Sequence, residues 1–245
     1  CNGKSTFMSI IQELMGSYNH QIKSDVLLLN RFGASSGPNP SLVKLIGSRL
    51  VVANELPEGA FMGENLVKSM TGDDVIVARG LYSKEELEFR PSFSLVMVGN
   101  HKPVIRDTSP GMWRRMMLLP FNASFSGEQL DPRLTGTLKA ELSGILNWAI
   151  AGTQMWLNKG IKRHVPQVLV ADIQRYRDES DLLGCFLEEK TSRQPDAWIA
   201  TDELFEAFRE WAEKGCEWKM TRNIMELKMK QHLLYGRYGN ISDYI

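Results

Sequence analysis

The sequence predicts an α/β fold with a parallel sheet flanked by helices, followed by a small helical module. The first observation is a Gly-Lys-Ser turn that opens an amphipathic helix at the start of the chain. The second is a pair of near-continuous apolar runs, at 49–55 and 93–100, which are typical of buried parallel strands. The third is a change to short helical patterns near the end. We therefore divide the chain into a core over 1–160, a helical connector over 161–180 and a terminal module over 181–245.

The composition is that of an ordinary globular protein of 245 residues, with 29 Lys and Arg against 29 Asp and Glu. The length excludes a small disulfide-stapled module. The zero net charge excludes a partner held by bulk charge alone but leaves room for a local basic site. The three Cys and four His lack metal-binding spacing. No apolar run approaches the roughly 20 residues of a membrane span and no signal peptide is visible, so we expect a soluble, cytoplasmic protein without a membrane partner.

The first expected helix follows a short polar run made of Asn2, Gly3, Lys4, Ser5 and Thr6. Gly-Lys-Ser before an amphipathic helix is the second half of a phosphate-binding P-loop, in which backbone N–H groups and the helix dipole hold phosphates. Lys4 would neutralise the terminal phosphates of ATP, and the Ser5 hydroxyl would bind Mg²⁺. A chance Gly-Lys-Ser tripeptide is the alternative, because the first glycine and the strand of a complete P-loop are missing from this sequence.

Two polar residues stand at the ends of the two expected strands. Glu55 ends the run 49–55 and Asn100 ends the run 93–100. Ligands of open parallel sheets bind at the carboxyl ends of the strands. Glu55 fits the base that polarises an attacking water, and also a contact to the Mg²⁺ of ATP, whereas Asn100 fits a residue that orients this water. For either residue alone a simple strand-end cap is the more common explanation, but the order of the three elements favours a nucleotide site.

An arginine pair, Arg114 and Arg115, precedes a third apolar run at 116–121, for which we expect a strand. In a ring-forming ATPase, an arginine at this position would reach the γ-phosphate held by a neighbouring subunit. The alternative is a pair of surface arginines stacked on Trp113.

Taken together, these motifs resemble the superfamily III helicases of the phage/plasmid primase type, a branch of the AAA+ ATPases. The resemblance extends over essentially the whole chain. It is carried by Asn2-Gly-Lys-Ser-Thr-Phe, Leu50-Val-Val-Ala-Asn-Glu-Leu-Pro-Glu-Gly, Lys68-Ser-Met-Thr-Gly-Asp-Asp-Val-Ile-Val-Ala-Arg-Gly-Leu-Tyr, Phe89-Arg-Pro-Ser-Phe, Val98-Gly-Asn-His-Lys-Pro, Trp113-Arg-Arg and Glu141-Leu-Ser-Gly-Ile-Leu-Asn-Trp.

The resemblance implies an AAA+ P-loop core that unwinds DNA with ATP and Mg²⁺. It further implies a homo-hexameric ring, action in phage, prophage or plasmid replication inside a bacterial cell, and a primase domain before residue 1. This sequence departs from the usual Asp-Glu pair at the acidic strand end, where it has Asn54-Glu55. We therefore expect Ser5 and water to carry more of the Mg²⁺ coordination.

The segment 71–93 predicts a β-hairpin with arms at 75–78 and 87–89. The resemblance implies that this hairpin projects into the ring channel and grips single-stranded DNA. Arg79 and Lys84 are the candidate phosphate contacts and Tyr82 is a candidate stacking residue. A solvated tip of mixed charge is the alternative, since three glutamates lie close by, at positions 85, 86 and 88.

The terminal module predicts helices over 182–190, 202–214 and 221–233, a strand-like run at 197–200 and a final two-stranded stretch from 235 to 245, which together suggest a winged helix. Duplex DNA would contact a basic face of its third helix and the wing. The basic candidates are Lys219, Arg222, Lys230 and Arg237. The expected apolar back consists of Met220, Ile224, Leu227 and Leu234. A protein-contact domain is the alternative, because Glu226 lies among the basic residues.

Two rivals to a helicase remain open at this point. One is a AAA+ remodelling or loading ATPase that does not unwind DNA, against which the hairpin at 71–93 argues. The other is a non-catalytic DNA-binding fragment, which the incomplete P-loop favours.

Overall fold

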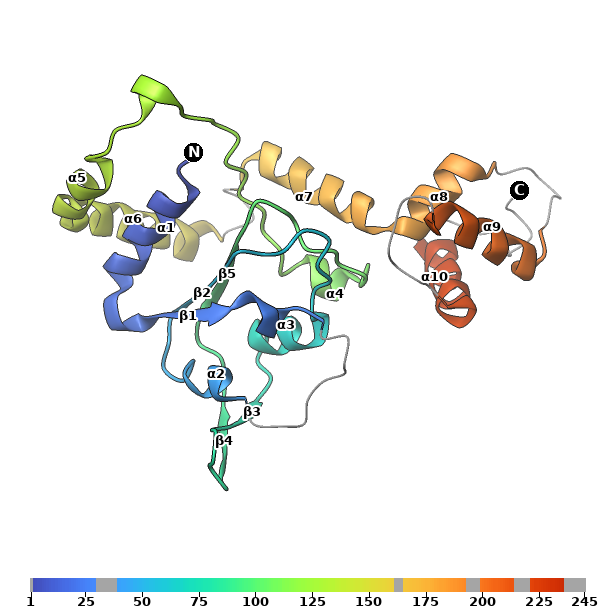
Figure 1. The fold of residues 1–245 in the computed structure, drawn as a ribbon, viewed down its shortest axis with the longest axis horizontal. Helices are drawn as coiled ribbons and strands as arrows, with labels where there is room; N and C mark the ends of the chain where they lie inside the picture. Colours follow the sequence, from blue (N-terminus) through green and yellow to red (C-terminus); the bar gives the residue numbers. More distant parts are fainter. Residues whose placement is uncertain (1, 30–38, 161–164, 193–198, 214–220, 236–245) are drawn as a thin grey trace. The chain divides into compact units, whose positions relative to one another are not determined.

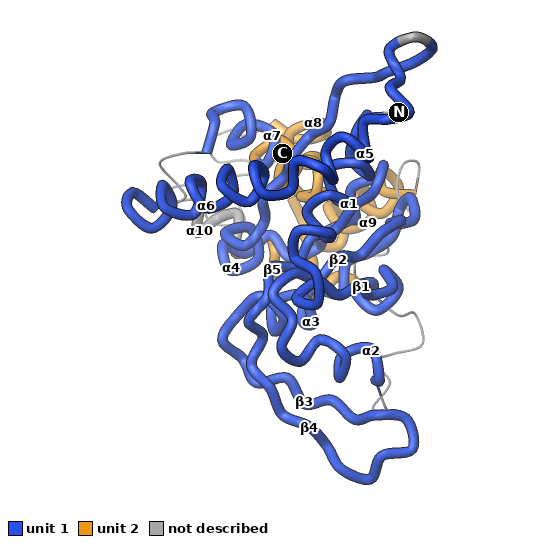
Figure 2. Tube along the Cα trace, turned by 90° about the vertical axis from the view of Figure 1, so that its left-hand side faces the viewer, with its two compact units in different colours: residues 1–173 blue, residues 174–245 orange. Residues whose placement is uncertain are grey.

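The computed structural model describes residues 2–29, 39–160, 165–192, 199–213 and 221–235. The chain divides into two compact units, residues 1–173 and residues 174–245, which are coloured separately in Figure 2.

The centre of the first unit is a parallel sheet of three strands, β1 (Asn19–Lys23), β2 (Leu50–Asn54) and β5 (Ser94–Val98), in the order β1-β2-β5. The middle strand β2 is buried except at Asn54. The register aligns Lys23, Asn54 and Val98, so the carboxyl ends of all three strands lie at one edge. This sheet and its flanking helices confirm the predicted α/β class.

Helices flank this sheet, and Figure 1 shows α1, α5 and α6 to one side of it and α3 and α4 to the other. The first side has α1 (Lys4–Met15), which contacts α5 (Leu134–Ala140) and α6 (Leu142–Lys159). The second has α3 (Glu64–Met70) and α4 (Pro110–Trp113). The remaining short helices are α2 (Pro40–Val43) and the 3-10 turns Gly16–Tyr18, Ser24–Leu27 and Gly127–Gln129.

The predicted hairpin is confirmed, with arms β3 (Ile76–Arg79) and β4 (Glu86–Phe89) that pair antiparallel. It extends away from the sheet in both views (Figures 1 and 2). Ile76 and Ala78 are buried, and β3 contacts α2. The base of the hairpin is therefore fixed on the first unit, while residues 80–85 form a free-standing tip.

Two expectations for the first unit are wrong. Residues 116–121 form no strand, since no strand of the described chain hydrogen-bonds to them, and Met117 and Leu119 are exposed. High β-propensity alone does not make a strand without a neighbouring ladder of N–H and C=O groups. The helical pattern over 134–159 is also interrupted at Glu141, which separates α5 from α6.

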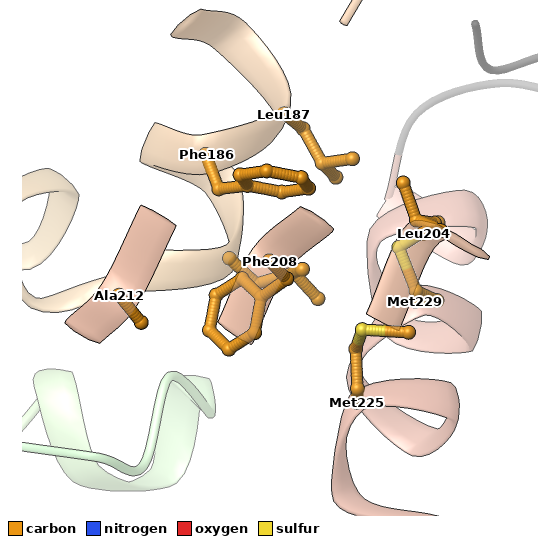
Figure 3. Close-up of a cluster of buried hydrophobic side chains, with 8 residues drawn as sticks. Phe186, Leu187, Leu204, Phe208, Ala212, Met225 and Met229 are labelled. Carbon is orange, nitrogen blue, oxygen red and sulfur yellow. The ribbon is translucent and has the colours of Figure 1, made fainter. Parts of the chain in front are cut away.

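The second unit has a three-helix core built from α8 (Leu182–Lys190), α9 (Thr201–Glu213) and α10 (Arg222–Tyr235); α7 (Gln167–Ser180) leads into it. Asp181 caps α8 by accepting a hydrogen bond from the N–H of Gly184. Phe186 and Phe208 meet edge to face with ring centroids 5.4 Å apart. Figure 3 shows them together with the other core side chains, which are Leu183, Leu187, Leu204, Ala212, Met225 and Met229.

The predicted apolar back of the third helix is wrong at Ile224, which is 43% exposed. Among the described side chains of α10, Met225 and Met229 enter the core instead. Met220 and the side chains of Leu227 and Leu234 are outside the description. Several apolar residues in this stretch allow more than one helical face, and packing against α8 and α9 selects the Met225–Met229 row. Ile199 and Ala200, at the end of the expected strand-like run, lie in no strand. Three ranges of the expected module are outside the described residues: 193–198, 214–220 and the wing at 236–245. No helix in the described ranges combines the length and the apolar character needed to cross a membrane.

Candidate active site

The amino end of α1 presents free backbone N–H groups at the carboxyl edge of the sheet. Gly3, the N-cap residue, has a φ of 83° and provides no side-chain cap. An L-residue would be strained in this left-handed conformation, which explains the glycine. Since the first turn of a helix has N–H groups without intrahelical partners and a partial positive charge, this helix start is suited to bind an anion.

Lys4 and Asn100 connect this helix start to the end of β5. The Lys4 Nζ donates a hydrogen bond of 2.9 Å to the Asn100 Oδ1. Asn2, directly ahead of the helix, donates from its Nδ2 to the carbonyl of Phe121 over 3.3 Å. The structure thus brings together a lysine and an asparagine that the sequence assigned to one site from separate motifs.

Glu55 directly follows β2 and has an unusual backbone conformation, with a φ of 61°. Its N–H donates to the carbonyl of Val98 over 2.9 Å, and its carbonyl accepts a 3.1 Å hydrogen bond from Ser24 Oγ. A non-glycine residue in this region costs on the order of 1 kcal/mol or more, and such strain concentrates at functional sites. The exposed Glu55 side chain is therefore held at the carboxyl edge by contacts of its own main chain.

The remaining phosphate-loop residues lie on the first turn of α1. Ser5 is exposed, while Thr6 is half-buried and its carbonyl accepts a 2.8 Å hydrogen bond from Ser9 Oγ. Within the described ranges, no group of three or more His, Cys, Asp or Glu side chains could hold a metal ion. The site offers the free start of α1, the Lys4 ammonium, the Ser5 hydroxyl and the Glu55 carboxylate. These groups fit a magnesium ion that takes most of its ligands from phosphates and water, and Ser5 and Glu55 would be its protein contacts.

A network that the sequence did not predict joins α3 to the segment after Asn100. The Glu64 carboxylate accepts from the N–H groups of Arg106 and Asp107, and Lys68 forms an ion pair with Asp107. Asp107 in turn accepts from the N–H of Ser109 over 2.8 Å, and its carbonyl accepts from Trp113 Nε1 over 2.9 Å. The two candidate arginines follow Trp113, so this network fixes the start of the segment that presents them.

Burial acts to raise the pKa of Asp107, but hydrogen bonds from Lys68 and Ser109, together with the charge of Lys68, outweigh it and lower that pKa. The carboxylate of Asp107 is therefore ionised at neutral pH, as the ion pair requires.

Arg114 and Arg115 lie at the other end of β5 from Lys4. They line a pocket of about 540 Å³ whose other walls include Pro91 and Phe93, which precede β5. Because a strand rises about 3.3 Å per residue, the five residues of β5 separate this pocket from Asn100 by roughly 13 Å or more. The structure does not bring either arginine to the phosphate loop of its own chain.

The hairpin candidates lie apart from both places. Tyr82 is 95% exposed at the tip, with a φ of 64°, and Lys84 is exposed beside it. Arg79 stands directly opposite Glu86 in the β3–β4 register. In this register the two side chains are on the same face of the hairpin, so the negative charge of Glu86 offsets part of the positive charge of Arg79, whereas the Tyr82 ring is open to solvent.

The basic candidates of the second unit are only partly described. Arg222 is held by two carboxylates, with its Nη1 2.7 Å from Asp202 Oδ1 and its Nε donating over 3.0 Å to Glu226 Oε1. Lys230 lies in α10, with its side chain outside the description, and Lys219 and Arg237 lie beyond the described ranges. In the described part of α10, the charge of Arg222 is therefore balanced by Asp202 and Glu226.

Comparison with known proteins identifies a matching family model and viral relatives of this chain. A family model described as "Family of unknown function (DUF5906)" matches residues 1–115. The chain is 28% identical over 228 residues to "Putative helicase 022R" of Frog virus 3, covering 86% of this chain and 23% of that protein. It is 32% identical over 125 residues to "Putative helicase L207/L206" of Acanthamoeba polyphaga mimivirus, covering 51% of this chain and 13% of that one.

A third relative carries a different name. The chain is 23% identical over 229 residues to "Putative primase C962R" of an African swine fever virus isolate, covering 86% of this chain and 24% of that protein. The chain thus spans about a quarter of the length of the relatives that match most of it. All three relatives are viral proteins, and the phage or plasmid setting expected from the sequence stays a prediction.

Proposed function

We propose that this chain is the ATPase core and terminal module of a DNA helicase that acts in viral or mobile-element DNA replication. The observation that carries the proposal is the Lys4–Asn100 hydrogen bond, which joins a phosphate-loop helix start to a polar strand end beside Glu55. The names of the viral relatives, two with helicase and one with primase, support it. The AAA+ superfamily III resemblance of the motifs adds the expected reaction, hydrolysis of ATP coupled to DNA unwinding.

The proposed roles follow the geometry of the carboxyl edge. The N–H groups of the first turn of α1 and the ammonium of Lys4 bind the phosphates, with Asn2, Gly3 and Thr6 shaping that turn. Glu55 accepts a proton from the attacking water, and Asn100 orients that water through its amide. Bound Mg²⁺, held through Ser5, Glu55 and water, would neutralise phosphate charge.

One arginine of the pair acts in trans in this proposal. Arg114 and Arg115 line a pocket with Pro91 and Phe93, which precede β5, whereas Lys4 contacts Asn100 after β5; this placement supports contact with a nucleotide bound by a second copy of the chain. A homo-hexameric ring is the proposed assembly, as in the helicases that the motifs resemble. An arginine supplied by a neighbour typically raises the rate of hydrolysis by about 10³–10⁵.

DNA contacts are assigned to two surfaces. Tyr82, with Arg79 and Lys84, would contact single-stranded DNA at the hairpin tip, chiefly by stacking because Glu86 faces Arg79. The second unit is proposed as a winged-helix module that contacts duplex DNA through Arg222, Lys230 and Arg237. Arg222 would have to exchange Asp202 or Glu226 for a phosphate there.

Three measurements on the same preparation test the proposal. Saturable, Mg²⁺-dependent binding of a fluorescent ATP analogue separates an ATPase from a non-catalytic DNA-binding fragment. Release of phosphate that single-stranded DNA stimulates, followed by displacement of a labelled strand from a forked duplex, separates a helicase from a remodelling ATPase. Nucleotide binding without strand displacement, under conditions where native mass spectrometry detects the assembled ring, would reject the helicase.

A further inference from the structure

The two adjacent arginines after α4 have different surroundings. Arg115 is half-buried and its Nη1 donates a hydrogen bond to the carbonyl of Gly111 in the preceding helix α4. Its Nε is buried, with no hydrogen-bond partner within the described residues. The side chain of Arg114 is exposed and makes no hydrogen bond or ion pair in the part of the chain that the structure describes, although its backbone N–H donates to the carbonyl of Pro110 over 3.1 Å. The Arg114 guanidinium is therefore open to contact another molecule, whereas the Arg115 guanidinium is held within its own chain.

The guanidinium of Arg115 lies against the root of the hairpin. A methyl group placed on Gly72 would be 3.4 Å from Arg115 Nη2 and 3.0 Å from the carbonyl oxygen of Lys68. Gly72 stands between the end of α3 and the start of β3, so Arg115 lies beside the segment that leads into the hairpin. On the other side of the root, Arg90 donates a hydrogen bond to the carbonyl of Asp73.

The same root is tied to the segment that follows Asn100. Lys68, whose carbonyl crowds Gly72, forms the ion pair with Asp107, and Trp113 donates to the carbonyl of Asp107. Arg115 completes this chain of contacts. It lies in the turn after Trp113, and its guanidinium lies beside Gly72. α3, the post-Asn100 segment and the hairpin root are thereby connected as one body.

We propose that the arginine pair has divided roles. Arg115 is a positioning residue that holds the root of the β3–β4 hairpin on α4, and Arg114 is the arginine that contacts the nucleotide of a second copy of the chain. The role of Arg114 rests on the proposed function, while the role of Arg115 rests on contacts within this chain alone. Charge alone does not distinguish the two residues, so each serves as the matched control for the other.

Amide hydrogen exchange tests the role of Arg115. In Arg115→Ala, amides of residues 72–90 should exchange at least about tenfold faster than in the parent chain, because the root opens more often, while amides of β2 stay unchanged. Arg114→Ala should leave exchange over 72–90 within about twofold of the parent. Arg115→Lys, which keeps the charge but has no second nitrogen for Gly72, should fall between the two.

If Arg115→Ala does not fold, Arg115→Lys serves as the milder variant and should still raise exchange over residues 72–90 above that of Arg114→Ala. Equal exchange in Arg114→Ala and Arg115→Ala, whether raised or unchanged, overturns the positioning role.

Subunit mixing tests the role of Arg114. Arg114→Ala and Lys4→Ala should each lose ATP turnover alone, and a mixture should recover part of it, because a Lys4→Ala copy supplies its intact Arg114 to the phosphate loop of an Arg114→Ala copy. A mixture that stays as inactive as its components, beside an active parent protein, overturns the trans role. A parent protein without any ATP turnover would reject the proposed function and with it the role of Arg114, whereas the exchange result would still stand for Arg115.

Discussion

Lys4 Nζ and Asn100 Oδ1 are 2.9 Å apart, although the two residues are 96 positions apart in the sequence. This hydrogen bond gives the lysine a partner at the carboxyl edge of the sheet when no phosphate is bound. In the proposed function, a phosphate that binds Lys4 would compete with the Asn100 oxygen, and the released amide would then orient water. In this proposal, occupation of the phosphate site is therefore linked to the state of Asn100.

This relationship predicts different kinetic effects for its two members. Lys4→Ala should weaken binding of a fluorescent ATP analogue by about ten- to a hundredfold, which corresponds to the loss of a charge-assisted contact of roughly 1.5–3 kcal/mol. Asn100→Ala should bind the analogue at least as tightly as the parent, because Lys4 loses a competing partner, while turnover falls. Lys44→Ala removes an exposed lysine outside the site and is the matched control. Weaker binding in Asn100→Ala would contradict this interpretation.

The strained backbone of Glu55 predicts that two substitutions at this position have the same effect on ATP turnover but different effects on folding stability. Glu55→Gln keeps the conformation with a φ of 61° and should lower ATP turnover by about 10²–10⁴-fold without weakening nucleotide binding. Glu55→Asn should be equally inactive but more stable than Glu55→Gln by about 0.5–1 kcal/mol, since Asn tolerates this region better. Chemical denaturation of both variants, beside phosphate-release assays, checks the prediction. Equal stability of the two variants would show that strain at Glu55 is negligible.

The ion pair between Lys68 and Asp107 predicts a dependence of stability on acid. Because the folded-state pKa of Asp107 is lowered, its contribution is fully present above the unfolded value of about 3.9 and is lost as the pH falls through the folded pKa. Asp107→Asn should therefore be less stable than the parent by about 1–2 kcal/mol at pH 7, between the values for exposed and buried pairs. The difference should shrink below about pH 4.

Thermal melts at several pH values between about 3 and 7 measure this difference in stability. This range includes the ordinary carboxyl pKa of about 4. Asp131→Asn, which changes an exposed carboxylate, serves as the control. A stability difference that stays constant over the whole range would assign the effect of Asp107→Asn to lost packing rather than to the charge.

The sequence predicted those elements whose local pattern and tertiary role agree. The apolar strands β2 and β5 and the hairpin arms follow from their composition and spacing. β1 was missed because Asn19–Lys23 is mostly polar, and it forms a strand by pairing with the buried β2. The run 116–121 was assigned wrongly for the opposite reason, because its β-propensity finds no partner among the described strands.

For the candidate site, sequence order brought Lys4, Glu55 and Asn100 to one edge, since the carboxyl ends of parallel strands must meet there. It could not show that Asp107 joins α3 to α4 or that Arg115 lies against Gly72. Those contacts depend on how α3 packs beside the post-Asn100 segment, which no spacing within a single element encodes. The phase of α10 failed similarly, because the core of the second unit, and not the helix itself, selects Met225 and Met229.

The exposed ring at the hairpin tip gives a prediction about DNA that separates stacking from charge. Tyr82 is 95% exposed, so Tyr82→Ala should leave the melting temperature unchanged while weakening single-stranded DNA binding, because a stacked base is worth about 1–3 kcal/mol, or roughly 5- to 150-fold. Tyr82→Phe should bind like the parent, since the ring supplies the contact.

Tyr18→Ala removes another exposed tyrosine far from the tip in the sequence and is the control. Fluorescence anisotropy with a labelled oligonucleotide at two salt concentrations measures the effect. A stacking contact should leave the salt dependence of binding unchanged in Tyr82→Ala, whereas Lys84→Ala should reduce it by about one counterion if Lys84 contacts a phosphate. Unaltered affinity in both Tyr82→Ala and Lys84→Ala would remove the hairpin tip from the proposed DNA-binding surface.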